Sequence, residues 1–121
     1  MQDTILIIED DESILEAIQM ILKAEGYHVM SSNSGEILQQ FVDEFPNLLI
    51  IDEHLPFERG SEICKRIKSQ EETANTPVLL LSGHAKIAEI AQKCGADGYI
   101  EKPFNLLSFI EIIDQHLKVS Q

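Results

Sequence analysis

Three short apolar runs that do not alternate with polar residues constrain the fold of this chain most strongly. They occupy residues 5–8, 48–51 and 78–81, and they consist of isoleucine, leucine and valine. A continuous apolar run of this length suits a strand buried on both faces, as in a parallel sheet covered by helices. Each run leads directly into a polar residue, and ligands bind such sheets at the carboxyl ends of the strands. The sequence therefore predicts a parallel sheet with a polar site at one edge.

Helical patterns separate the strands, which include two shorter ones at residues 27–30 and 98–103. Apolar residues recur at helical spacing in five segments. The predicted helices run from residue 13 to a stop at Gly26, between Gly35 and Phe45, between Gly60 and Ser69, over residues 87–94 before Gly95, and over residues 104–117. Five strands that alternate with five helices predict an α/β fold, a three-layer (βα)5 sandwich with a five-stranded parallel sheet.

Length and charge limit the classes of function. At 121 residues the chain has the size of one domain, and no apolar run approaches the roughly 20 residues of a membrane helix. Without repeats or linkers, we expect one domain over residues 1–121, with a core from about 4 to 118. No signal-peptide pattern opens the chain, so we expect a cytoplasmic protein without a membrane partner. A formal net charge of -12 disfavours direct nucleic-acid binding and favours metal cations or basic partner surfaces.

Polar groups follow four of the predicted strands. They are Glu9, Asp10, Asp52, Ser82 and Lys102. The carboxyl ends of parallel strands meet at one edge, so these side chains should converge on one site. Three carboxylates repel one another unless a cation compensates, and Mg²⁺ prefers such oxygen ligands. With one lysine the cluster keeps two negative charges, which a divalent cation would neutralise.

A site of this kind can transfer a phosphoryl group. Phosphoryl transfer needs positioning and charge stabilisation more than covalent machinery. Asp52 can act as the nucleophile, while Lys102 and the Ser82 hydroxyl can bind phosphoryl oxygens. For each residue alone, a surface ion pair or a helix cap is the simpler interpretation, but five such residues at one edge favour a common site.

The order and spacing of these motifs resemble one family across residues 5–117. The motifs are Glu9-Asp10, Asp52 followed by Leu55-Pro56 and Gly60, Ser82-Gly83, and Lys102-Pro103-Phe104. Together they are similar to the receiver domain of two-component response regulators, the CheY-like domains. The resemblance implies a flavodoxin-like fold with the strand order 2-1-3-4-5.

The resemblance also implies the function and the role of each residue. Asp52 would accept a phosphoryl group from a histidine kinase or a histidine phosphotransfer protein. Asp10 and Asp52 would bind Mg²⁺ directly, Glu9 through water and His54 through its backbone carbonyl. Ser82 and Tyr99 would be the switch residues. The chain would catalyse only its own phosphorylation and dephosphorylation, and is not expected to be an enzyme otherwise.

The signal would then reach a downstream protein, or an output domain absent from this chain. The implied readout surface comprises the helix at 87–94, the strand at 98–103 and the helix at 104–117. In the last helix we take Leu106, Phe109, Ile110, Ile113 and Leu117 as the buried face. Leu107 and Ile112 widen this apolar arc, which indicates either a docking or phosphorylation-linked homodimer surface or a broadly buried helix.

The sequence does not decide the role of two histidines, and it leaves two alternative functions to consider. His54 and His84 each lie two residues after a site residue, at positions that influence phosphorylation and dephosphorylation rates in the family, or are ordinary loop histidines. A haloacid dehalogenase-type phosphatase or phosphotransferase also places an aspartate after an apolar strand, but its second acid would fall where His54 stands. A non-catalytic flavodoxin-like binding module would need a glycine-rich phosphate loop, which this sequence lacks.

Overall fold

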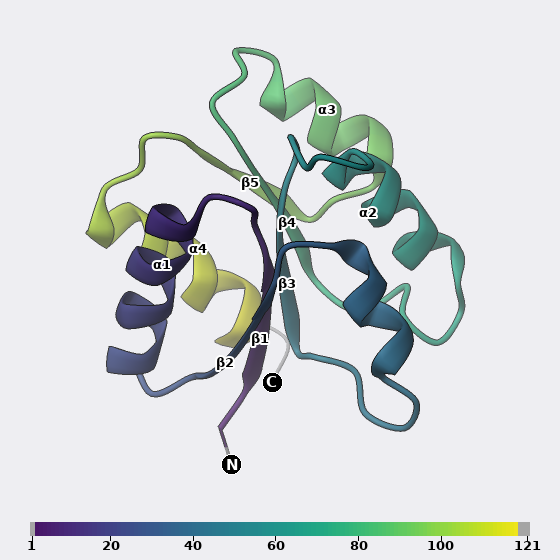
Figure 1. Ribbon diagram of the computed structural model, residues 1–121, viewed down its shortest axis with the longest axis horizontal. Helices are drawn as coiled ribbons and strands as arrows, with labels where there is room; N and C mark the ends of the chain where they lie inside the picture. Colours follow the sequence, from purple (N-terminus) through teal and green to yellow (C-terminus); the bar gives the residue numbers. More distant parts are fainter. Residues whose placement is uncertain (1, 119–121) are drawn as a thin grey trace.

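In the computed structural model, which describes residues 2–118, a five-stranded parallel sheet forms the centre of the molecule (Figure 1). The strands are β1 (Thr4–Ile8), β2 (His28–Ser32), β3 (Leu48–Asp52), β4 (Val78–Ser82) and β5 (Gly98–Glu101). Their order is β2-β1-β3-β4-β5, as the resemblance implied. The predicted fold class is confirmed.

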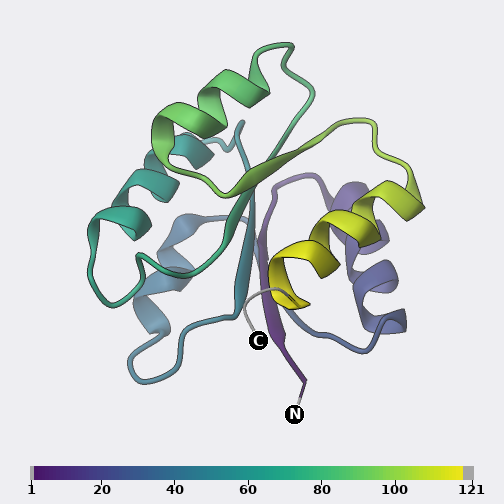
Figure 2. The same ribbon diagram turned by 180° about the vertical axis from the view of Figure 1, so that it is seen from behind.

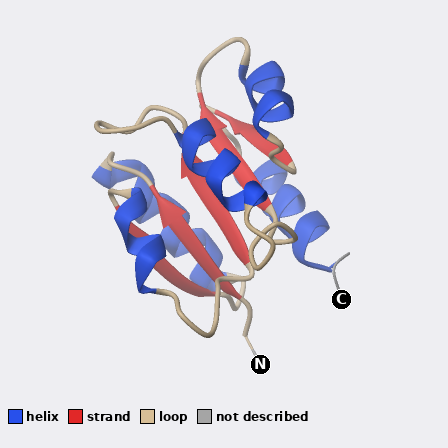
Figure 3. Cartoon of the chain, turned by 90° about the vertical axis from the view of Figure 1, so that its right-hand side faces the viewer, coloured by secondary structure: helices blue, strands red, loops and turns tan. Residues whose placement is uncertain are grey.

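Helices cover both faces of the sheet, which gives three layers (Figures 1 and 2). They are α1 (Glu12–Ala24), the 3₁₀ helix η1 (Gly35–Gln40), α2 (Gly60–Ser69), α3 (Ile87–Cys94) and α4 (Leu106–Lys118). Helices α1 and α4 pack on one face, and η1, α2 and α3 pack on the other. Figure 3, seen from the side, shows the sheet between the helices. No helix within residues 2–118 is both long enough and apolar enough to cross a membrane.

The uninterrupted apolar runs supply two cores at once. Side chains alternate between the faces of a strand, so Ile5 and Ile7 join the core under α1 and α4, while Leu6 and Ile8 join the other core. All four are fully buried. Burial of such a side chain contributes about 1.5–3 kcal/mol, which explains why both faces are apolar.

The second helical segment differs from the prediction. It is a 3₁₀ helix of six residues that ends at Gln40, and Val42, within the predicted helical segment, lies beyond it and is 88% exposed. Phe41 follows the helix with an extended backbone, and both Leu38 and Phe41 pack on the core. The tertiary contacts of these two side chains override the α-helical spacing in the sequence.

The last helix also differs from the prediction at its start. It begins at Leu106. The side-chain oxygen Oδ1 of the preceding residue, Asn105, accepts a hydrogen bond from the backbone N–H of Ser108 at 2.8 Å. Leu106, predicted to be buried, is 51% exposed, and Leu107 is 72% exposed, whereas Phe104, just before the helix, packs against the core. Phe109 is fully buried, as predicted.

Candidate functional site

The carboxyl ends of β1 and β3 bring three acids together. Glu9 and Asp10 follow β1, and Asp52 is the last residue of β3. One carboxylate oxygen from each lies within 4.8 Å of the others. Glu9 and Asp52 are buried and Asp10 is exposed, so the cluster has an inner wall and an open side. The predicted convergence of these acids is present.

Lys102 follows β5 and reaches across the sheet edge to both buried acids. Its ammonium nitrogen lies 3.3 Å from Oε2 of Glu9 and 3.5 Å from Oδ1 of Asp52. Its side chain is 24% exposed, so the cation stands at the rim between the buried acids and solvent. An ammonium in this position partly compensates the repulsion between the carboxylates.

Ser82 ends β4, between the strands that carry Asp52 and Lys102. Its backbone carbonyl accepts a hydrogen bond from the N–H of Lys102 at 2.9 Å. The Ser82 side chain is fully buried, and its hydroxyl oxygen accepts from the N–H of His84 at 3.0 Å. A hydroxyl that accepts this bond keeps its own proton to donate.

The acid cluster fits a hard divalent cation. Oε1 of Glu9 accepts a hydrogen bond from the N–H of Asp11 at 3.1 Å, but within residues 2–118 nothing donates a hydrogen bond to the buried Oε2. Lys102 forms an ion pair with that oxygen without a hydrogen bond. A buried carboxylate oxygen in this state is unfavourable, and a hydrated cation would satisfy it.

The pKa of Glu9 is raised from 4.5 to about 7, chiefly by burial and in smaller part by the negative charge of Asp52. The hydrogen bond from Asp11 and the charge of Lys102 act in the opposite direction without cancelling the effect of burial. Part of the Glu9 population is therefore protonated near neutral pH in the metal-free protein. A cation at the cluster would favour the ionised form.

The two flanking histidines face each other over the edge of the sheet. The ring centroids of His54 and His84 are 6.3 Å apart, with the planes tilted by 34°. The backbone N–H of His54 donates to Oδ1 of Asp52 at 3.3 Å, and Nδ1 of His84 accepts from the N–H of Lys86 at 3.0 Å. Both side chains are exposed, so they border the site rather than form its wall.

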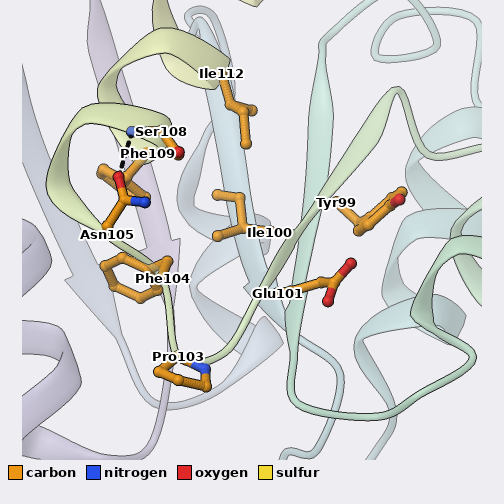
Figure 4. A pocket seen from close by; sticks show the side chains of 9 residues that line it. All are labelled: Tyr99, Ile100, Glu101, Pro103, Phe104, Asn105, Ser108, Phe109 and Ile112. Atoms are coloured by element: carbon orange, nitrogen blue, oxygen red, sulfur yellow. Dashed lines mark hydrogen bonds between the residues drawn. The ribbon is translucent and has the colours of Figure 1, made fainter.

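Tyr99 lies apart from the acid cluster. It is 36% exposed on β5 and lines a pocket of about 380 Å³. The pocket is also lined by Ile100, Glu101, Pro103, Phe104, Asn105, Ser108, Phe109 and Ile112. Figure 4 shows Tyr99 and Glu101 on one side of β5 and Ile100 on the other. The pocket lies on the implied readout surface, and none of the three acids of the cluster lines it.

Sequence reasoning missed one buried acid beside the site. Glu53 directly follows Asp52, is 1% exposed, and accepts two hydrogen bonds from Ser61 at the start of α2. In the sequence it stands in a loop between Asp52 and Gly60, where an acid ordinarily faces solvent. The available signal was a serine immediately after Gly60, where a helix exposes N–H groups that need an acceptor.

Comparisons with known proteins identify the family. Residues 5–114 match the model of the response regulator receiver domain. The chain is 31% identical over 120 residues to the polar-differentiation response regulator DivK of Brucella ovis, a match that covers 97% of this chain and 98% of DivK. It is 33% identical over 111 residues to a histidine kinase of Formosa agariphila, covering 89% of this chain and 8% of the kinase. The chain thus spans a small part of that relative.

A solved structure agrees with these matches. The crystal structure of a protein described as a response regulator from Chloroflexus aurantiacus has a TM-score of 0.92 to this chain and 31% sequence identity. That match covers 98% of this chain and 99% of the other. Because the family match runs through all five strands and includes every acid at the sheet edge, this chain belongs to the receiver domains of two-component response regulators.

Proposed function

We propose that Asp52 is the phosphoacceptor of this receiver domain. It would take a phosphoryl group from a phosphohistidine on a histidine kinase or a histidine phosphotransfer protein. The observation that carries the proposal is the position of Asp52, buried between two acids and 3.5 Å from the ammonium of Lys102. A carboxylate beside a cation and a hydroxyl donor has the groups that phosphoryl transfer requires.

The chemistry follows from the groups at the edge of the sheet. An oxygen of Asp52 attacks phosphorus, the phosphorus–nitrogen bond to the donor imidazole breaks, and that nitrogen takes up a proton. Lys102 and the Ser82 hydroxyl bind phosphoryl oxygens and stabilise the developing charge. Glu9, Asp10, Asp52 and the backbone carbonyl of His54 would hold Mg²⁺, which neutralises charge on the phosphoryl group. Later attack by water on phosphorus releases inorganic phosphate and restores Asp52.

Phosphorylation would act as a switch because it adds roughly 1.5 to 2 negative charges and new acceptor oxygens. Ser82 and Lys102 are the groups within the site that can respond to these charges. Their backbones are hydrogen-bonded to each other, and β5 connects Lys102 to Tyr99 and its pocket. We infer that the surface of α3, β5 and α4 changes and is read by a partner, by an output domain or by a second copy of the chain.

The test is to incubate the protein with phosphoramidate or acetyl phosphate and Mg²⁺ and to measure its intact mass. We expect one phosphoryl adduct that is lost in Asp52→Asn and when EDTA replaces Mg²⁺. Asp43→Asn, which changes an exposed acid outside the site, is the matched control and should still form the adduct. Hydrolysis of a small phosphoester without a lasting adduct would instead support the phosphatase alternative. A protein that forms no adduct and binds no Mg²⁺ would contradict both functions.

The proposed setting is the cytoplasm, with one domain over residues 1–121 and a core over about 4–118. The ends of that range, residue 1 and residues 119–121, lie outside the part of the chain that the structure describes. Outside its own phosphorylation and dephosphorylation, we propose no catalytic activity. The two flanking histidines would influence the rates of these two reactions.

A further inference from the structure

Glu53 is a buried carboxylate next to Asp52 that does not belong to the acid cluster. Its Oε1 accepts a hydrogen bond from the backbone N–H of Ser61 at 2.7 Å, and its Oε2 accepts from the Ser61 hydroxyl at 3.0 Å. Ser61 is the second residue of α2, where backbone N–H groups have no partner within the helix. These bonds offset the cost of burying a carboxylate that is only 1% exposed. Glu53 therefore ties the end of β3 to the start of α2.

Backbone contacts hold the same loop at its base. The N–H of Glu53 donates to the carbonyl of Leu81 at 3.0 Å, and its carbonyl accepts from the N–H of Gly60 at 3.1 Å. A Cβ atom at Gly60 would collide with the backbone carbonyl oxygen of Asp52, so the two ends of the loop are in close contact. Within the loop, His54 and Arg59 pair as an isolated antiparallel bridge. Residues 53–61 thus form a closed loop whose ends are held together by main-chain and side-chain hydrogen bonds.

This loop contains the only main-chain group assigned to the proposed metal site, the carbonyl of His54. A side-chain ligand can adjust its rotamer, but a backbone carbonyl can move only with its loop. The backbone N–H of His54 already donates to Oδ1 of Asp52 at 3.3 Å, which restrains the backbone on the amino side of this residue. Mg²⁺ tolerates little departure from octahedral geometry, which makes its affinity sensitive to small movements of such a ligand.

We propose that Glu53 is a positioning residue for the metal site, because its bonds to Ser61 fix the loop that carries the His54 carbonyl. This inference rests on the proposed function, in which the cluster binds Mg²⁺. Glu53 lies outside the group of ligand atoms and would act only through the loop. The arrangement is that of an outer partner which orients a ligand without touching the metal.

The test compares Mg²⁺ dissociation constants, measured by titration calorimetry, with thermal unfolding of the metal-free proteins. Glu53→Leu fills similar space without an acceptor, and its dissociation constant should rise about 10-fold, as is typical when an outer-shell partner is lost. Glu53→Gln keeps one acceptor for the Ser61 N–H and gains a donor for the hydroxyl, so its constant should stay near that of the wild type. Ile67→Val, a buried change in the same helix away from the loop, should lower stability without changing the constant.

The possible results distinguish a positioning role of Glu53 from a purely structural one. If the wild type binds Mg²⁺ and Glu53→Leu binds it equally well while melting at a lower temperature, Glu53 is purely structural and the inference is overturned. If Glu53→Leu does not fold, Ser61→Ala decides, since it removes only the hydroxyl bond: a raised dissociation constant supports the inference and an unchanged one overturns it. If the wild type itself binds no Mg²⁺, the proposed function fails first, and the inference fails with it.

Discussion

The buried charge of Glu9 should make the metal-free protein less stable as the pH rises, and Glu9→Gln should remove this dependence. In the unfolded chain Glu9 ionises with a pKa near 4.5, whereas in the folded protein its pKa is raised to about 7, chiefly by burial. Between these values the folded state binds more protons, so its stability falls as the pH rises. The decrease in unfolding free energy is complete above pH 7 and absent below pH 4.5. At 1.36 kcal/mol per pKa unit, it amounts to about 3 kcal/mol.

Urea unfolding in EDTA at about pH 5 and pH 8 measures this effect. The difference in unfolding free energy between Glu9→Gln and the wild type should shift by about 2.5 kcal/mol in favour of the variant at the higher pH. Groups that do not interact with Glu9 also titrate over this range, but their contributions to the unfolding free energy cancel in the difference. Glu16→Gln, which removes an exposed acid, is the control and should show no such shift. An equal Glu9→Gln difference at both pH values would refute the claim that burial of this charge is costly.

Three further substitutions separate phosphorylation from stability. Lys102→Met should retain Mg²⁺ binding but form the phosphoryl adduct at least about 10-fold more slowly, because a charge-assisted hydrogen bond contributes about 1.5–3 kcal/mol; an unchanged rate by mass spectrometry would contradict this. Gly60→Ala should lower the unfolding free energy by about 1–3 kcal/mol through its collision with the Asp52 carbonyl; an unchanged melting temperature would contradict the close packing. Lys68→Met, which loses a 2.7 Å ion pair to Asp97, should cost about 1–3 kcal/mol in urea unfolding and leave adduct formation unchanged.

Local patterning predicted most of the fold, because the sheet is buried on both faces. A run such as Ile5–Ile8 cannot satisfy two cores unless every residue is apolar, so the strands are readable in the sequence. Strand order is different: hydrogen bonding between β1 and β3 joins residues far apart, and no periodicity records it. That order came from the family resemblance. The 3₁₀ form of η1 was missed because it depends on how Leu38 and Phe41 meet the core.

The candidate site was predictable to the extent that it depends on strand ends. Glu9, Asp52 and Lys102 converge because parallel strands deliver their carboxyl ends to one edge, a consequence of topology alone. Glu53 could not be recognised in the same way, since its burial depends on a partner eight residues later. Acids with non-local partners look identical, in the sequence, to acids that face solvent. Only the three-dimensional arrangement of the loop after β3 and the helix α2 shows that Glu53 has a partner.

Two buried acids at this edge show opposite ways to accommodate a charge. Both oxygens of Glu53 accept hydrogen bonds from Ser61, so this acid is satisfied by the protein itself. Glu9 has one oxygen bonded and the other buried without a hydrogen-bond donor among residues 2–118. Selection for stability alone would remove the second arrangement, because a neutral amide at Glu9 lowers the cost of burial. The proposed Mg²⁺ would compensate this oxygen, so Mg²⁺ should stabilise the wild type more than it stabilises Glu9→Gln.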